Sequence, residues 1–158
     1  MNRVLALGEM AMQTIQFHLA ENQLQFDTTE QQFVFDIGLK LLMEKCIRRA
    51  HFDDLAIEYL IYEIEEILEQ LKLEHRVERT GISQDAELKT LSHVFFQDSQ
   101  IIDRIALEAA FNQMVERKEY YLNLLAQDAF TLLSYFVFIR EMMHHLNIVY
   151  IELGTKAL

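Results

Sequence analysis

Apolar residues recur at three- and four-residue spacing along most of this chain, which is the repeat of one face of an α-helix. The strictest example steps by four and three residues from Leu132 to Leu153. A second clear stripe runs from Ile57 to Leu71, with glutamates on the opposite face. Six helices are therefore predicted. The first covers residues 3–24, the second begins at a cap formed by Thr28 or Thr29 and ends near residue 50, and the third begins at a cap formed by Asp53 or Asp54 and ends near residue 77. The last three cover residues 84–96, 99–125 and 127–153.

The breaks between these stretches are short, and the sequence contains no proline at all. Proline disrupts helix interiors, so its absence fits a chain made almost entirely of helices and turns. The clearest break is residues 80–83, where Gly81 is expected to end one helix in a left-handed conformation and Ser83 to cap the next. No stretch alternates apolar and polar residues for long enough to predict a half-buried strand.

The fold expected from this pattern is an all-α helical bundle of five or six helices, of the up-and-down type, in a single domain over residues 1–158. Whether the helices 99–125 and 127–153 are continuous stays open. Residues 130–139 are apolar on all sides, which places that helix at the centre of the fold or at an interface. We expect a dimer formed through the helix 130–153, because two-fold dimers are the commonest assemblies.

Composition adds a strong negative charge to this picture. The 158 residues include 25 acidic and 14 basic side chains, which give a formal net charge of −11. Such a field repels phosphate backbones, so we expect no nucleic-acid binding and instead a protein partner, possibly a basic one. The expected docking residues lie on the outer face of the helix 54–77 and are Glu58, Glu65, Glu66 and Glu69.

Cysteine usage and hydropathy point to a cytoplasmic protein without membrane association. The only cysteine, Cys46, excludes an internal disulfide and is expected to be a small core residue. The longest nearly apolar run, residues 130–139, is ten residues long, whereas a membrane-spanning helix needs about 20. We find no secretory signal in the sequence.

Reactive side chains gather in residues 140–145, where Glu141 and His145 lie one helical turn apart. The simplest interpretation is a solvated polar face. A second follows from Arg140 and His145, whose spacing resembles the Arg-x4–6-His motif of the HEPN family of small all-helical domains. The resemblance implies a dimer that presents Arg140 and His145 as catalytic residues for RNA cleavage.

Glu141 and His144 give a third interpretation, because ferritin-like bundles hold two irons with Glu-x-x-His pairs. Those sites need two such pairs and two further inward glutamates, and this sequence offers one pair. A glycine-rich phosphate loop is not possible either, because the four glycines are scattered. We therefore expect no cofactor and no metal.

These observations favour a non-catalytic interaction protein over an enzyme: an acidic adaptor, an antitoxin- or immunity-like binder, or a regulatory subunit. The first alternative is a HEPN-like ribonuclease with Arg140 and His145 at a dimer interface. The second is a metal-binding four-helix-type bundle that uses Glu141 and His144. The sequence specifies neither the partner nor a substrate.

Overall fold

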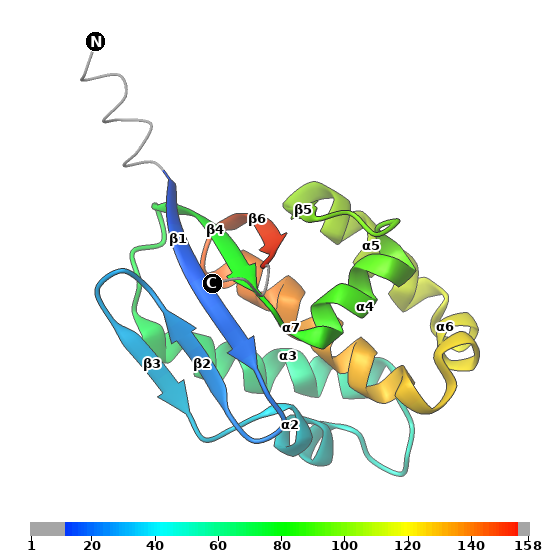
Figure 1. The fold of residues 1–158 in the computed structure, drawn as a ribbon. Coiled ribbons are helices and arrows are strands. Elements are labelled where there is room, and N and C mark those ends of the chain that lie inside the picture. The colour runs from blue at the N-terminus through cyan, green and yellow to red at the C-terminus, as the bar shows by residue number, and fades with distance from the viewer. Residues whose placement is uncertain (1–11, 155–158) are drawn as a thin grey trace.

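The computed structural model, which describes residues 12–154, contains one six-stranded mixed sheet (Figure 1). Of this part of the chain, 54% is helical and 23% lies in strands, so the prediction of an all-α bundle is wrong. The strands are β1 (Met12–Leu19), β2 (Leu24–Asp27), β3 (Gln32–Phe35), β4 (Glu78–Ser83), β5 (Ile101–Asp103) and β6 (Ile148–Leu153).

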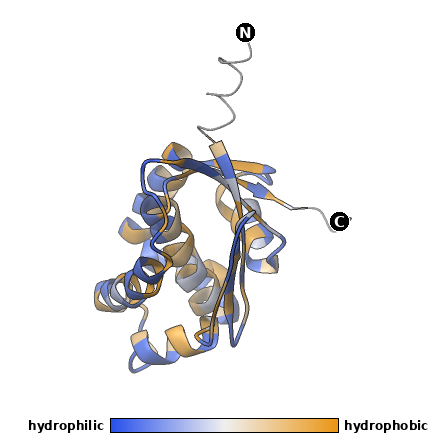
Figure 2. Ribbon diagram, turned by 90° about the vertical axis from the view of Figure 1, so that its left-hand side faces the viewer, coloured by the Kyte–Doolittle hydropathy of each residue, from blue (hydrophilic) through white to orange (hydrophobic). Residues whose placement is uncertain are grey.

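Most of the helices lie to one side of the sheet (Figure 2). They are α2 (Leu39–Cys46), α3 (Asp54–Leu68), α4 (Ala86–Phe95), α5 (Arg104–Glu116), α6 (Lys118–Leu125) and α7 (Ala129–His145), with short 3₁₀ turns at Glu69–Leu71 and Ala126–Asp128. The helix at the centre is α7, which packs against each of the other five.

The order of strands in the sheet is β3-β2-β1-β4-β6-β5. β1, β4 and β6 run parallel to one another, with Gly81 of β4 opposite Ile15 on one side and Ile151 on the other. The other three strands are antiparallel to their neighbours. The carboxyl ends of the three parallel strands therefore meet at one end of the sheet, which is where open α/β sheets bind their ligands. Below, we call the two ends of these strands the carboxyl end and the amino end of the sheet.

The first predicted helix, over residues 3–24, is instead the strand β1 and the start of a hairpin. Ile15, Phe17 and Leu19 are buried, and the residues between them are exposed. This period of two belongs to a strand. Two of the three residues are also four positions apart, so the same pattern fits a helical stripe. Residues 3–11 of the predicted helix lie outside the described residues.

The second predicted helix starts later than expected, as α2. The hydroxyl of Thr28 caps no helix; it closes the β2–β3 turn by accepting a hydrogen bond from the N–H of Gln31 at 3.0 Å. Gly38, just before α2, lies against the β1–β2 turn, where a Cβ would stand 2.4 Å from the backbone nitrogen of Gln23. Only glycine permits this close approach of two backbone segments.

The predicted break at residues 80–83 is the end of the central strand β4. Gly81 lies inside the strand and does not have the left-handed backbone that the sequence predicts for it. A Cβ at Gly81 would stand 3.3 Å from the ring of Phe17 and 3.4 Å from a methyl group of Ile148. The glycine therefore makes room for side chains of the two neighbouring strands.

α3 and α4 begin close to the predicted positions. The carboxylate of Asp53 accepts a hydrogen bond from the N–H of Ala56 at 2.9 Å, which is the side-chain cap that the sequence suggests. α3 ends at Leu68, well before residue 77. The predicted helix 99–125 begins as the short strand β5 and is then divided at Arg117 into α5 and α6.

The last predicted helix, over residues 127–153, is α7 followed by β6. The helix ends at His145, and Asn147 takes a left-handed backbone with φ 52°. Asparagine tolerates this conformation better than most residues, and it turns the chain into the sheet. The apolar repeat that continues to Leu153 is therefore shared between a helix and a strand.

The apolar residues of α7 are covered by other elements of the same chain. Residues 132–139 are all buried, so of the two predicted positions for this helix, the centre of the fold is the one that the structure shows. By length and composition alone, the helical stretch Lys118–His145 could cross a membrane, but core helices pass the same test and half of its most apolar window is buried. A dimer through the helix 130–153 stays a prediction.

Candidate functional site

Two clusters of ionisable side chains lie at opposite ends of the parallel strands. The first surrounds Asp85, which follows β4 at the carboxyl end of the sheet. The second surrounds Arg140 and His145 at the amino end, where α7 leads into β6. Only the second is suggested by the sequence pattern.

Asp85 is a buried carboxylate, 5% exposed, at the start of α4. Its Oδ2 accepts hydrogen bonds from the backbone N–H of Leu19 at 3.0 Å and from the hydroxyl of Tyr135 at 2.7 Å. Its Oδ1 pairs with Nδ1 of His18. Because a buried charge needs partners of this kind, these three donors fix the position of the carboxylate.

Tyr135 is fully buried in α7 beside Asp85. Burial, followed by the negative charge of Asp85, raises the pKa of the Tyr135 phenol well above its usual value. The phenol therefore keeps its proton and donates a hydrogen bond to the carboxylate. The hydroxyl of Ser83 accepts a hydrogen bond from the backbone N–H of Asp85 at 3.0 Å, so the backbone of this residue is held as well.

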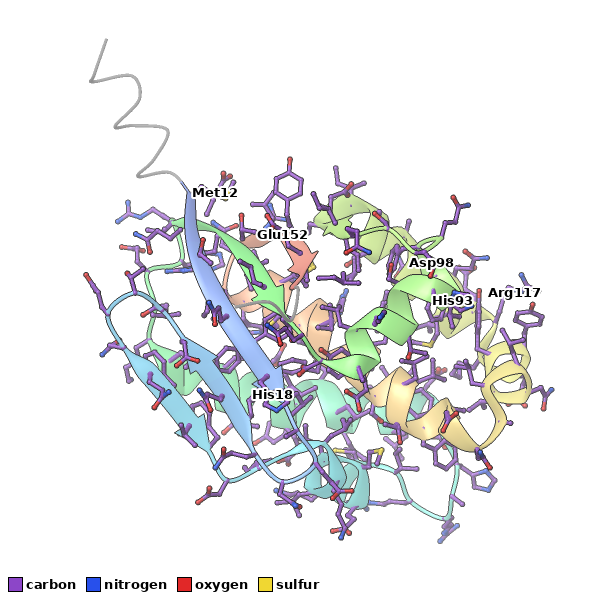
Figure 3. The ribbon with its side chains drawn as sticks, in the orientation of Figure 1. Met12, His18, His93, Asp98, Arg117 and Glu152 are labelled. Carbon is purple, nitrogen blue, oxygen red and sulfur yellow. The ribbon has the colours of Figure 1, made fainter. Side chains whose placement is uncertain are left out.

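His18 is the last residue but one of β1 and lies near the carboxyl end of the sheet (Figure 3). Its side chain is 65% exposed, whereas that of Asp85 is 1% exposed. An ionised carboxylate only accepts hydrogen bonds, so Nδ1 of His18 carries the proton that it shares with Asp85. In the neutral ring, Nε2 then has a free lone pair. This arrangement can supply a proton acceptor of fixed tautomer at the protein surface.

Two adjoining hollows flank this cluster and share Ser83 and Gln84 as a wall. The hollow on the His18 side has a volume of about 350 Å³, and the one on the other side, which includes Lys89, about 360 Å³. Lys89 lies in the first turns of α4, whose N-terminus carries a partial positive charge. An anion bound there would lie close to the His18–Asp85 pair.

The N-terminus of α2 also points toward the carboxyl end, but its amide groups are already engaged. The N–H groups of Leu39 and Lys40 donate to the carbonyl oxygens of Ala20 and Glu21 in the β1–β2 turn, at 2.8 and 3.0 Å. The carboxylate of Glu21 also adds negative charge to this turn. The start of α4 has Glu87 in its first turn, but it also has Lys89 and adjoins Asp85, so it is the better candidate for an anion.

At the amino end of the sheet, Arg140 is bound by two carboxylates. Its guanidinium donates to both oxygens of Glu108, at 3.2 and 3.0 Å, and to Oε2 of Glu141 at 2.8 Å. The hydrogen bond from Arg140 lowers the pKa of Glu108, whereas burial raises that of Glu141. Arg140 thus has two carboxylate partners within its own chain, and its predicted role at a dimer interface stays a prediction.

His145 is also engaged, because its Nε2 lies 3.2 Å from Oε2 of Glu65 and 4.0 Å from Oε1 of Glu141. The sequence pairs Arg140 with His145 as in the HEPN motif, but in the structure Arg140 binds Glu108 and His145 binds Glu65, and Glu141 lies between them. The non-catalytic helical adaptor and the HEPN-like helical domain are both overturned by the α/β fold.

The predicted metal ligands Glu141 and His144 differ in burial in the structure. Glu141 is buried and lies near His145, one helical turn further along α7. His144 is exposed and lines a cleft of about 800 Å³ together with Glu108 and Arg104. Metal binding by this pair stays a prediction.

The acidic face of α3 is only partly the solvated surface that the sequence predicts. Glu58, Glu66 and Glu69 are exposed, as expected. Glu65 instead turns toward α7 and its carboxylate contacts His145. Docking of a basic partner on this face stays a prediction.

His18, Asp85 and Tyr135 are not among the functional residues that the sequence pattern predicts. Two signals were available in the sequence. Apolar and polar residues alternate around His18, which indicates a strand, and Asp85 stands just after residues 80–83 and just before a predicted helix. Had residues 80–83 been interpreted as a buried strand, Asp85 would have stood at its carboxyl end, where functional residues concentrate. Tyr135 lies in an apolar run and has no comparable signal.

The sequence matches no protein-family model and no curated protein. Solved structures, in contrast, resemble this chain over most of its length. The Ppx/GppA enzyme of Aquifex aeolicus matches 90% of this chain with a TM-score of 0.68 at 11% identity. An exopolyphosphatase from Cytophaga hutchinsonii matches 92% with a TM-score of 0.66 at 10% identity, and an exopolyphosphatase-like protein matches 93% with a TM-score of 0.64 at 11% identity.

This chain spans about half the length of these neighbours, since the matches cover 53%, 54% and 56% of the three structures. At such low identity the likeness establishes the fold and nothing about chemistry. The fold of this chain is the mixed α/β, actin-like fold that is found in Ppx/GppA phosphatases.

Proposed function

We propose that this chain is a domain of a hydrolase that acts on a phosphoanhydride or phosphate ester, with His18 as the general base. The observation that carries the proposal is the pairing of exposed His18 with buried Asp85 at the carboxyl end of the parallel strands. The neighbours named as exopolyphosphatases support the choice of a phosphate-containing substrate.

The proposed chemistry follows from the orientation of the His18 ring. Nε2 accepts a proton from a water molecule while the water oxygen forms a bond to phosphorus, and the bond from phosphorus to the leaving oxygen breaks. The leaving oxygen then takes up a proton, which returns the imidazole to its neutral form. Asp85 stabilises the imidazolium that forms in between and keeps Nε2 directed outward.

Binding of the substrate is assigned to the start of α4. The partial positive charge of the helix N-terminus and the ammonium group of Lys89 are local features that favour an anion. They act at short range, whereas the net charge of −11 acts over the whole surface and is screened by salt. An anion between Lys89 and His18 would place phosphorus within reach of the activated water.

The test is release of orthophosphate from pyrophosphate, long-chain polyphosphate, ATP and p-nitrophenyl phosphate in buffer that contains magnesium. We expect one of these to be hydrolysed, and His18→Gln to lower kcat by roughly 100-fold or more, the usual contribution of a general base. His93→Gln is the matched control, because His93 also pairs with an aspartate but lies elsewhere on the surface.

Two results would contradict the proposal. One is a wild-type chain that hydrolyses none of the four substrates. The other is a His18→Gln variant that keeps wild-type kcat and has the same urea midpoint as the wild type, which shows that it is folded.

A further inference from the structure

Glu65 of α3 and Glu141 and His145 of α7 bring three metal-ligating atoms together at the amino end of the sheet. One carboxylate oxygen from each glutamate and one ring nitrogen lie within 4.8 Å of one another. We propose that these three side chains bind a divalent transition-metal ion. This site lies at the other end of the parallel strands from Asp85, so the proposal is independent of the proposed hydrolase function.

The distances are close to those that a metal ion requires. Nε2 of His145 lies 3.2 Å from Oε2 of Glu65 and 4.0 Å from Oε1 of Glu141. With bonds of about 2.1 Å, a tetrahedral ion holds its ligand atoms about 3.4 Å apart. A small change in side-chain torsion angles would therefore let all three atoms bind one ion.

The charges around this site favour a cation. The carboxylates of Glu108 and Glu141 contact the guanidinium of Arg140, and that of Glu65 contacts His145, so one guanidinium neutralises only one of three carboxylates. Glu141 is the most buried, with a side chain 3% exposed. Its Oε2 binds Arg140, while its Oε1 points toward His145 from beyond hydrogen-bonding distance. A divalent ion between Glu141 and His145 would bind this oxygen and balance the remaining charge.

The donor set also indicates the kind of metal. Two carboxylates and one imidazole suit Zn²⁺, Mn²⁺ or Fe²⁺ better than they suit Ca²⁺, which prefers oxygen ligands alone. Three protein ligands leave coordination positions open, as in metal sites that bind water or a substrate. His145 also lines the cleft of about 800 Å³, so an open position could be reached from solvent.

Titration calorimetry with ZnCl₂ and with MnCl₂ on the chelator-treated full chain tests the proposal. We expect one equivalent of at least one ion to bind. Glu65→Gln and His145→Gln should weaken this binding by roughly 100-fold or more, because changes outside the ligand shell alone cost roughly 10- to 100-fold. Glu66→Gln and His144→Gln are matched controls from exposed neighbours on the same two helices and should bind as the wild type does.

The proposal is overturned if neither ion binds stoichiometrically at 1 mM. It is equally overturned if His144→Gln weakens binding as much as His145→Gln does, or if His18→Gln removes it, because the ion would then lie in the cleft or at Asp85. Cobalt(II) gives a second readout that does not depend on stability: its visible absorption should be induced by the wild type and lost in His145→Gln.

Discussion

Two histidine–aspartate pairs lie on the surface of this molecule, and they are nearly identical in the exposure of the histidine. His18 is 65% exposed and His93 is 72% exposed. The aspartates differ: the side chain of Asp85 is 1% exposed and that of Asp98 is 69% exposed. Figure 3 shows the two histidines at separate places, His18 near the end of β1 and His93 on α4 beside Asp98.

This difference in burial shows that the environment of the carboxylate determines whether a histidine–aspartate pair can take part in catalysis. Asp98 is surrounded by water, so its 2.9 Å contact with His93 competes with hydration and is worth little. Asp85 is held by Leu19 and Tyr135 as well as by His18. A carboxylate fixed in this way can fix the tautomer of its histidine, which is why we assign chemistry to one pair and none to the other.

The largest effect is expected from Asp85→Ala. The N–H of Leu19 and the hydroxyl of Tyr135 would lose their acceptor inside the protein, and each buried donor left unpaired costs about 1–3 kcal/mol. We therefore expect the free energy of unfolding to fall by about 3 kcal/mol, measured by urea denaturation at pH 7. A loss below about 1 kcal/mol would mean that Asp85 is not the anchor that the comparison requires.

A smaller effect, and one that depends on pH, is expected from Tyr135→Phe. Removing the hydroxyl takes one hydrogen bond from a charged acceptor, which costs about 2 kcal/mol at pH 7. Because the pKa of Tyr135 is raised in the folded state, the stability that this phenol contributes is present below pH 10, the usual tyrosine value, and is lost as the pH rises through the higher folded value. The difference in stability between wild type and variant should therefore shrink between pH 9 and pH 11.

Tyr120→Phe is the control for this pH dependence, because Tyr120 is 49% exposed. This substitution removes a hydroxyl from the surface, and its stability relative to wild type is measured over the same pH range. A Tyr135→Phe difference that stays constant or grows over the same range would contradict the assigned direction of the pKa shift.

The sequence predicted the structure best where the pattern of residues arises within a single helix. The Asp53 cap and the start of α3 are local features, and the structure contains them. Cys46 was predicted to be a core residue; it is buried, and burial raises its pKa to about 11. These predictions need only the residues within one or two helical turns.

The sheet could not be predicted in the same way, because its evidence is long-range. The pairing of β1 with β4 joins residues more than 60 positions apart, such as Ile15 and Gly81. The apolar repeat of α7 continues through β6, although Tyr150 in that repeat is 42% exposed. A spacing of four fits both a helical face and one side of a strand, so the repeat alone does not separate them.

The two candidate sites show the same division. Residues 140–145 were singled out because Arg140, Glu141 and His145 are close in sequence, but their partners Glu65 and Glu108 come from α3 and α5. His18 and Asp85 are 67 residues apart, and no local spacing connects them. Chemistry that depends on the packing of distant elements leaves little trace in a single sequence.

The smallest effect is expected from Asp98→Asn, which completes the comparison. Asp98 has a left-handed backbone with φ 61°, a conformation that asparagine also tolerates, so the substitution changes the charge and leaves the turn intact. An exposed ion pair contributes about 0.2–1 kcal/mol, and the asparagine oxygen can still accept a hydrogen bond from His93, so urea denaturation at pH 7 should show a loss below about 0.5 kcal/mol. If Asp98→Asn destabilised the protein as much as Asp85→Ala does, burial of the carboxylate would not be what distinguishes the two pairs, and the assignment of His18 over His93 would lose its physical basis.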